Sequence, residues 1–146
     1  MSAGENLTAI TDAQVEQLVA AAKQARARAY APYSRYLVGA ALLTKGGKVF
    51  AGCNVENASY GACLCAERNA IGQMVAAGQA EPVACAVVTK GPRGGSPCGI
   101  CRQVLSEFAS DMTVVLVGVT DDGKEERRHT TLAALLPDAF ERSALD

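Results

Sequence analysis

Three cysteines and one glutamate in this chain have the types and the spacing of a catalytic metal site. Cys65 and Glu67 stand two residues apart, and Cys98 and Cys101 form a C-x-x-C pair directly after Pro97. Zinc held by three protein thiolates keeps a fourth position open for water, whereas a structural zinc site closes all four positions. The pattern therefore predicts one catalytic Zn²⁺ per chain, with Glu67 moving the protons of the water without binding the metal.

Two other interpretations of the cysteines stay open on this pattern. A closed structural zinc needs a fourth protein ligand, which would be Cys63 or His129, although Cys63 and Cys65 lack the spacing of a zinc knuckle. A redox dithiol would use the C-x-x-C pair alone and needs neither the C-x-E segment nor the proline. The remaining cysteines, Cys53, Cys63 and Cys85, are expected to behave as small buried hydrophobic residues.

Two arginines lie close to the predicted ligands in sequence, Arg68 three residues after Cys65 and Arg102 directly after Cys101. Three thiolates give the metal centre a net negative charge, which opposes ionisation of the water, so an offsetting positive charge is needed. Arg68 and Arg102 can donate hydrogen bonds to sulfur and draw charge from it, together with the N-termini of the two helices that the cysteines begin. Solvated helix faces are the alternative interpretation of both arginines.

Asn54 and Glu56 form a second polar pair, upstream of the cysteines. Residues two apart on a strand point to the same side, so one amide and one carboxylate could together hold a vicinal diol. The alternative is a pair of polar residues near a turn. A carboxylate in that place disfavours a phosphate, whereas the basic, glycine-rich segment 90–96 is either a turn or a phosphate-binding loop.

Composition limits the class of protein. The chain has 146 residues and a formal net charge of -1, which predicts one domain over residues 1–146 and no nucleic-acid partner. No apolar stretch approaches a membrane span, and the first residues lack the pattern of a secretion signal. We therefore expect a cytoplasmic protein without a membrane partner, in which the six cysteines stay reduced.

Hydrophobic periodicity and turn residues predict the elements that position these residues. Both cysteine groups fall where a helix begins after a strand, which is where open α/β sheets place their sites. The pattern predicts a three-layer α/β/α sandwich with a five-strand mixed sheet. The expected order is a helix at 12–29, a hairpin at 37–44 and 48–55, a helix at 65–77, a strand at 82–89, a helix at 98–110, strands at 113–119 and 124–129, and a short helix at 131–136.

With these residues placed, the sequence resembles the cytidine deaminases of the short-chain, all-cysteine zinc type, over nearly its whole length. The resemblance is carried by motifs in order along the chain: Tyr33-Ser34, Val38-Gly39-Ala40-Ala41, Asn54-Val55-Glu56-Asn57-Ala58-Ser59-Tyr60, Cys65-Ala66-Glu67-Arg68, Pro97-Cys98-Gly99-Ile100-Cys101-Arg102-Gln103 and Leu135-Leu136-Pro137-Asp138-Ala139-Phe140. The sequence departs from many relatives at Tyr36, where they have Phe, and at Leu37, where they have Pro.

The resemblance implies hydrolytic deamination of cytidine and 2′-deoxycytidine in pyrimidine salvage, with Zn²⁺ on the three cysteines. It implies a homotetramer with shared active sites, in which a neighbouring chain donates Phe140. Deamination of another cytosine-containing compound (a nucleotide, an antibiotic or a polynucleotide) and a non-catalytic structural zinc module remain the alternatives. The implied roles are proton shuttle and protonation of the base N3 for Glu67, contacts with the ribose hydroxyls for Asn54 and Glu56, a backbone contact with the base carbonyl for Ala66, packing on the base for Tyr36 and Phe140, and support of the metal ligands for Arg68, Arg102 and Gln103.

Overall fold

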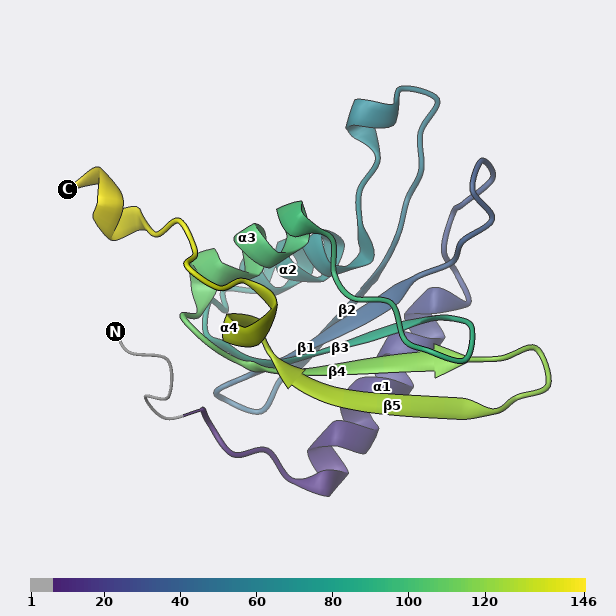
Figure 1. Ribbon diagram of the computed structural model, residues 1–146, viewed down its shortest axis with the longest axis horizontal. Helices are drawn as coiled ribbons and strands as arrows, with labels where there is room; N and C mark the ends of the chain where they lie inside the picture. The colour runs from purple at the N-terminus through teal and green to yellow at the C-terminus, as the bar shows by residue number, and fades with distance from the viewer. Residues whose placement is uncertain (1–6) are drawn as a thin grey trace.

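The computed structural model describes residues 7–146. It has the predicted three-layer α/β/α arrangement, with one mixed sheet in the middle layer whose strands lie in the order β2-β1-β3-β4-β5 (Figure 1). The strands are β1 Gly39–Thr44, β2 Val49–Cys53, β3 Pro82–Lys90, β4 Thr113–Val119 and β5 Glu125–Thr131. The α-helices are α1 Asp12–Arg26, α2 Ala66–Ala76, α3 Gly99–Phe108 and α4 Leu132–Leu135.

The sheet joins two hairpins through its central strands. β1 pairs antiparallel with both β2 and β3, β4 pairs parallel with β3, and β5 returns antiparallel along β4 at the sheet edge. The connection from β3 to β4 runs through α3, as the strand-helix-strand pattern predicts. Because β3 and β4 are parallel, their carboxyl ends meet at one edge of the sheet, close to the start of α3.

Alternation along the central strands builds a separate core on each face of the sheet. On β1, Ala40 and Leu42 pack toward α2, α3 and α4, whereas Ala41 and Leu43 pack toward α1. β3 and β4 alternate in the same way, since consecutive side chains of a strand point to opposite faces. The central strands β1, β3 and β4 are therefore buried on both faces, and within residues 7–146 α1 is the helix that covers one of these faces.

Most predicted element ends lie within one residue of the observed ends, whereas the predicted ends at residues 29, 37, 55, 110 and 129 differ by two or three residues. The capping box of Thr11 and Gln14 begins α1, and Thr131 caps α4. α1 ends at Arg26 rather than at residue 29, because Tyr30 pairs with Val55 and must be extended. β2 ends at Cys53 rather than at residue 55, because its partner β1 begins opposite at Gly39.

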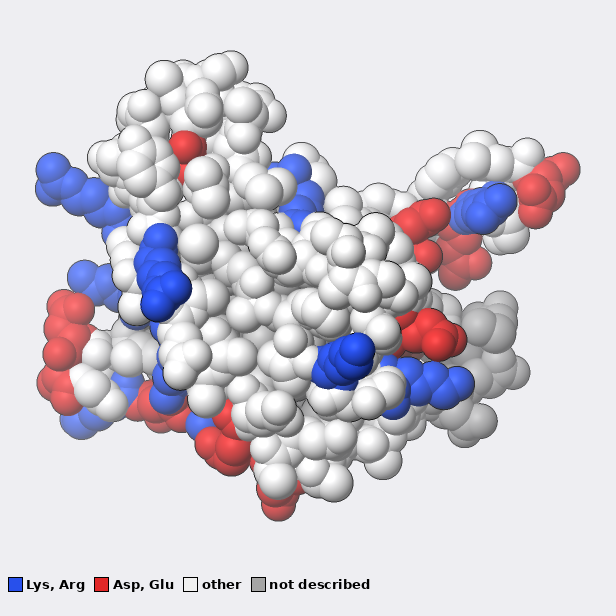
Figure 2. Space-filling view, turned by 180° about the vertical axis from the view of Figure 1, so that it is seen from behind, with Lys and Arg blue, Asp and Glu red and all other residues white. Residues whose placement is uncertain are grey.

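Two segments stand away from the sheet. Residues 54–64, with the 3₁₀ turn η1 Tyr60–Ala62, rise above the body, and the C-terminal segment from residue 137, with η2 Arg142–Leu145, extends to one side (Figure 1). In the view from behind, the raised segment is almost free of charged side chains (Figure 2). Elsewhere on that face acidic and basic side chains are interspersed, which differs from the basic patch of a nucleic-acid-binding surface.

None of the helices within residues 7–146 is both long and apolar enough to cross a membrane. The expectation that the chain lacks a secretion signal depends partly on residues 1–6, which lie outside the described residues.

Candidate active site

The three cysteines with ligand spacing come together at the N-termini of two helices. Cys65 is the N-cap of α2 and Cys98 is the N-cap of α3, with Cys101 in the first turn of α3. Sγ of Cys98 lies 3.9 Å from Sγ of Cys65 and 3.4 Å from Sγ of Cys101. Thiolates at about 2.3 Å from a tetrahedral zinc stand about 3.8 Å apart, so the cluster has the dimensions of a zinc site.

The surroundings of the cluster favour a thiolate at Cys65. A hydrogen bond from the Cys101 thiol, followed by one from the Arg68 guanidinium, lowers the pKa of Cys65 to about 5. The same bond raises the pKa of Cys101 above its ordinary value, because Cys101 keeps the proton that it donates. Cys65 is therefore ionised at neutral pH, which is the form that binds a metal.

The two arginines beside the ligands make different contacts. Nη2 of Arg68 donates to Sγ of Cys65 at 3.3 Å and to the carbonyl oxygen of Cys63 at 3.4 Å. Arg102 instead donates from Nε to the carbonyl oxygen of Pro97 at 2.8 Å and from Nη1 to that of Leu135. Arg68 thus lies against a ligand sulfur, as expected, whereas Arg102 ties the start of α3 to the end of α4.

Glu67 occupies the first turn of α2, one residue after Ala66, and only 4% of its surface is exposed. Burial raises the pKa of its carboxyl group, and the charge of Cys65 adds to the increase. A carboxyl group whose pKa is raised binds a proton more readily than a free carboxyl group does, which suits a group that must both accept and donate protons. The position and the burial of Glu67 suit a proton carrier.

A cavity of about 280 Å³ brings most of the predicted site residues together. α2 and α3 contribute Cys65, Ala66, Glu67 and Cys98 to its wall. Among the described residues that line it, Tyr36 is the one aromatic side chain. The other lining residues are Ser34, Val38, Asn54, Glu56, Val87, Thr89, Gly95 and Ser96.

Asn54 and Glu56 line the cavity and also build its outer wall. Asn54 accepts the N–H of Val38 at Oδ1 over 2.9 Å and donates from Nδ2 to the carbonyl oxygen of Tyr36 over 2.8 Å. Oε1 of Glu56 accepts the N–H groups of Tyr33 and Ser34 at 2.9 and 3.1 Å. The hydroxyl of Ser34, followed by these backbone groups, holds the pKa of Glu56 below its usual value.

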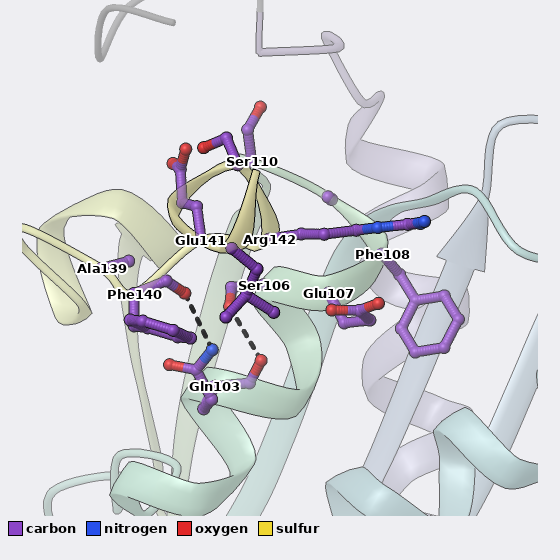
Figure 3. Close-up of a pocket in the computed structure, with 12 residues that line it drawn as sticks. Gln103, Ser106, Glu107, Phe108, Ser110, Ala139, Phe140, Glu141 and Arg142 are labelled. Atoms are coloured by element: carbon purple, nitrogen blue, oxygen red, sulfur yellow. Dashed lines mark hydrogen bonds between the residues drawn. The ribbon is translucent and has the colours of Figure 1, made fainter.

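Phe140 lies outside the cavity of its own chain. Its carbonyl oxygen accepts a hydrogen bond of 3.0 Å from Nε2 of Gln103, and both residues line a groove between α3 and the C-terminal segment (Figure 3). The exposed fraction of Phe140 is 61%. The structure therefore does not bring Phe140 to the other site residues within one chain.

The residues that could close a structural zinc site are directed elsewhere. Sγ of Cys63 accepts the N–H of Asn57 at 3.3 Å, and His129 lies exposed on β5 opposite Val115. Within residues 7–146, the cluster of three cysteines is the one group of three or more potential ligand side chains placed close enough to share an ion.

Several lining residues carry no obvious chemistry in the sequence. Val87 and Thr89 belong to the buried run of β3, and Gly95 and Ser96 belong to the segment read as a turn or a phosphate loop. The position of Thr89 near the carboxyl end of a parallel strand is the one signal that could have pointed to it.

Three comparisons agree on the relatives of this chain. A family model described as the cytidine and deoxycytidylate deaminase zinc-binding region matches residues 12–117. A cytidine deaminase of Sporosarcina psychrophila is 47% identical over 134 residues, which cover 90% of this chain and 94% of that protein. A blasticidin-S deaminase of Bacillus cereus is a more distant relative, 32% identical over 118 residues, which cover 75% of this chain and 81% of that protein.

The fold has solved counterparts as well. The crystal structure of cytidine deaminase from Burkholderia pseudomallei matches with a TM-score of 0.78 and 50% identity, covering 90% of this chain and 100% of that chain. The chain belongs to the zinc-binding family of cytidine and deoxycytidylate deaminases.

Proposed function

We propose that this protein hydrolyses cytidine and 2′-deoxycytidine to uridine and 2′-deoxyuridine, with release of ammonia. The observation that carries the proposal is one cavity lined by two of the clustered thiols and by the buried carboxyl group of Glu67. Zinc bound by the three cysteines would supply a water of lowered pKa to the C4 atom of the base. The 47% identity to a cytidine deaminase over most of both chains supports the same reaction.

Glu67 carries the protons in this proposal. Its carboxylate takes one proton from the attacking water and places it on N3 of the pyrimidine. It then takes the remaining proton of the hydroxyl group added at C4 and delivers it to the amino nitrogen, which leaves as ammonia. The raised pKa of the buried carboxyl group supports this role, because the group must change protonation state within one turnover. The backbone N–H of Ala66, at the start of α2, would bind the base carbonyl oxygen.

The sugar would bind at the outer wall. Asn54 and Glu56 keep acceptor and donor capacity beside the bonds that fix residues 33–38, so they could hold two adjacent ribose hydroxyls. The lowered pKa of Glu56 keeps its carboxylate ionised. An ionised carboxylate here would repel a phosphate, so a nucleoside is a better substrate than a nucleotide or a polynucleotide.

The remaining residues support the metal and the assembly. Arg68 would offset thiolate charge, while Arg102 and Gln103 hold α3 to α4 and to the C-terminal segment. Phe140 would pack on the base bound in a neighbouring chain of a homotetramer. We further propose that residues 1–146 form one cytoplasmic domain that acts in pyrimidine salvage.

Ultraviolet absorbance on free substrates, combined with metal analysis, tests the proposal. We expect about one zinc per chain, efficient loss of cytidine absorbance with release of ammonia, weak turnover of cytidine 5′-monophosphate and none of single-stranded DNA. Zinc without turnover of any cytosine compound would favour a structural zinc module. Comparable rates on cytidine and its monophosphate would indicate that segment 90–96 is a phosphate-binding loop. Preferential turnover of blasticidin S would indicate that the substrate is this antibiotic and not cytidine.

A further inference from the structure

The segment between β3 and α3 meets the ring of Tyr36 at Gly95. A Cβ atom at position 95 would lie 2.8 Å from the hydroxyl oxygen of Tyr36 and 3.3 Å from both Oγ1 and Cγ2 of Thr89. All three residues line the cavity that holds Glu67. The backbone of Gly95 therefore fills the space between a strand residue and the phenol, and no side chain fits there without displacing one of them.

Thr89 fixes the position of Gly95 relative to the sheet. Oγ1 of Thr89 accepts the N–H of Gly95 at 2.8 Å, and Thr89 itself is 2% exposed. Thr89 belongs to β3, where it pairs with Gly118 of the neighbouring strand. Gly94 also lies tightly on the sheet, since a Cβ atom there would stand 2.7 Å from the backbone of Leu116. Contacts with β3 and β4 therefore hold Gly94 and Gly95 in place against the sheet.

Tyr36 is the partner that can move. Its exposed fraction is 43%, and the contact with Gly95 is made by the far end of its side chain. A methyl group at position 95 would consequently displace the ring rather than the segment. The cysteines and Glu67 lie on α2 and α3, so a displaced ring leaves the chemical groups in place.

We propose that Gly95 and Thr89 are positioning residues that set the orientation of the Tyr36 ring, and thereby the affinity of the cavity for a pyrimidine base. The inference rests on the proposed function, in which Tyr36 packs on the base. It makes Tyr36 and Gly95 a matched pair: a phenol at position 36 requires glycine at position 95, whereas a phenyl ring there would leave room for a methyl group.

A double-mutant cycle tests the pairing, with Gly95→Ala, Tyr36→Phe and the double variant. The measurements are kcat and KM for cytidine and the calorimetric Kd of uridine. We expect Gly95→Ala to raise KM and Kd about 10-fold with a much smaller change in kcat, as for a displaced substrate-positioning group. In the double variant, Tyr36→Phe should restore most of the lost affinity, because it removes the hydroxyl oxygen that lies nearest to the new methyl group.

Thr89 gives a second and independent measurement. Thr89→Val removes the acceptor at nearly constant volume and should raise KM, whereas Thr89→Ser keeps the hydroxyl and should recover most of the affinity. Gly46→Ala is the matched control, because the nearest atom to its new Cβ, apart from those of the adjacent residues, would be Oγ1 of Thr44 at 4.0 Å. Zinc content and melting temperature are compared for every variant.

Three outcomes would overturn the inference: additive effects of Gly95→Ala and Tyr36→Phe, a fall in kcat with unchanged KM and Kd, or equal losses for the two Thr89 variants. Failure of the proposed function is distinguishable, since it would appear as a wild-type protein that neither converts cytidine nor binds uridine.

Discussion

At the scale of single residues, the site depends on one carboxyl group that is enclosed by protein and lies next to three thiols. Glu67 is 4% exposed, and its pKa is raised by burial. A carboxylate in such a place is costly to keep ionised unless a cation or a proton compensates its charge. A bound zinc would supply that cation, so burial of Glu67 and metal binding by the cysteines belong together.

Replacing Glu67 with Gln should separate metal binding from proton transfer. The amide keeps the shape of the side chain but cannot accept a proton, and Glu67 is not one of the clustered ligands. We expect Glu67→Gln to retain zinc and the melting temperature and to lose well over about 10²-fold in kcat, since one group serves several proton transfers. Steady-state kinetics with metal analysis measure this, and near-normal turnover by zinc-replete Glu67→Gln would refute the mechanism.

Single cysteine substitutions should identify the metal ligands. Cys98→Ala removes one of three donors and should release zinc and abolish activity, because two thiolates hold zinc much more weakly. Cys63→Ala and His129→Ala are controls outside the cluster, and each should keep its zinc and its activity. Metal analysis after dialysis measures the effect. Loss of zinc from either control would support a closed structural site instead.

At the scale of elements, two glycines let helices approach the sheet closely. A Cβ atom at Gly52 of β2 would lie 2.6 Å from the backbone nitrogen of Ala70 in α2, and one at Gly39 of β1 would lie 1.9 Å from the carbonyl oxygen of Ala22 in α1. Backbone atoms cannot move aside as the end of a side chain can. A methyl group at either position must therefore displace a helix.

The two glycines should differ in what their substitution damages. Overpacking typically costs about 1–3 kcal/mol, so Gly52→Ala and Gly39→Ala should both lower the free energy of unfolding by at least that much. Only Gly52→Ala displaces α2, which carries Cys65 and Glu67, and only it should also weaken zinc binding in the folded protein. Urea denaturation and zinc titration measure the two effects.

A matched control is Gly72→Ala on α2, where a new Cβ atom has no neighbour within 4 Å. It should stabilise the helix by about 0.5–1 kcal/mol. Equal zinc affinities in Gly52→Ala and Gly39→Ala would show that α2 can shift without disturbing its N-terminal cysteine.

The sequence predicts the elements and the metal cluster well, because the signals for them are local. The cap at Thr11, the glycine turns and the continuous apolar run of β4 each lie within a few residues, and C-x-E and C-x-x-C both begin helices. The cavity wall was harder to predict, because it depends on contacts between distant segments. The close approach of Gly95 to the Tyr36 hydroxyl involves residues nearly sixty positions apart in sequence. Neither residue type alone predicts that contact.

At the scale of the whole molecule, several of the large apolar side chains left exposed lie on the two segments that stand away from the sheet. The raised segment 54–64 carries Tyr60, which is 76% exposed, and the C-terminal segment carries Phe140 and Leu145, which are 61% and 74% exposed. Large apolar side chains gathered on protruding segments are typical of protein interfaces. They support the proposal that the protein acts as an assembly in which one chain completes the cavity of another.

Complementation between two inactive chains tests whether Phe140 acts in a neighbour. A Phe140→Ala chain keeps Glu67, and a Glu67→Gln chain keeps Phe140. Each variant alone should have low activity. After the two are unfolded together and refolded as mixed tetramers, about a quarter of the wild-type activity should return, because half of the sites keep Glu67 and half of those face an intact Phe140.

The control is a mixture of the two variants that were assembled separately, which should stay inactive until subunits exchange. Sedimentation at the assay concentration shows whether the mixed species are tetramers, since activity that depends on a shared site must follow assembly. If Phe140 instead folded back into the cavity of its own chain, no mixed site would hold both groups, and refolding together would restore nothing. The groove between α3 and the C-terminal segment (Figure 3) already directs Phe140 outward, with its carbonyl oxygen held by Gln103, so we expect the mixed tetramers to be active.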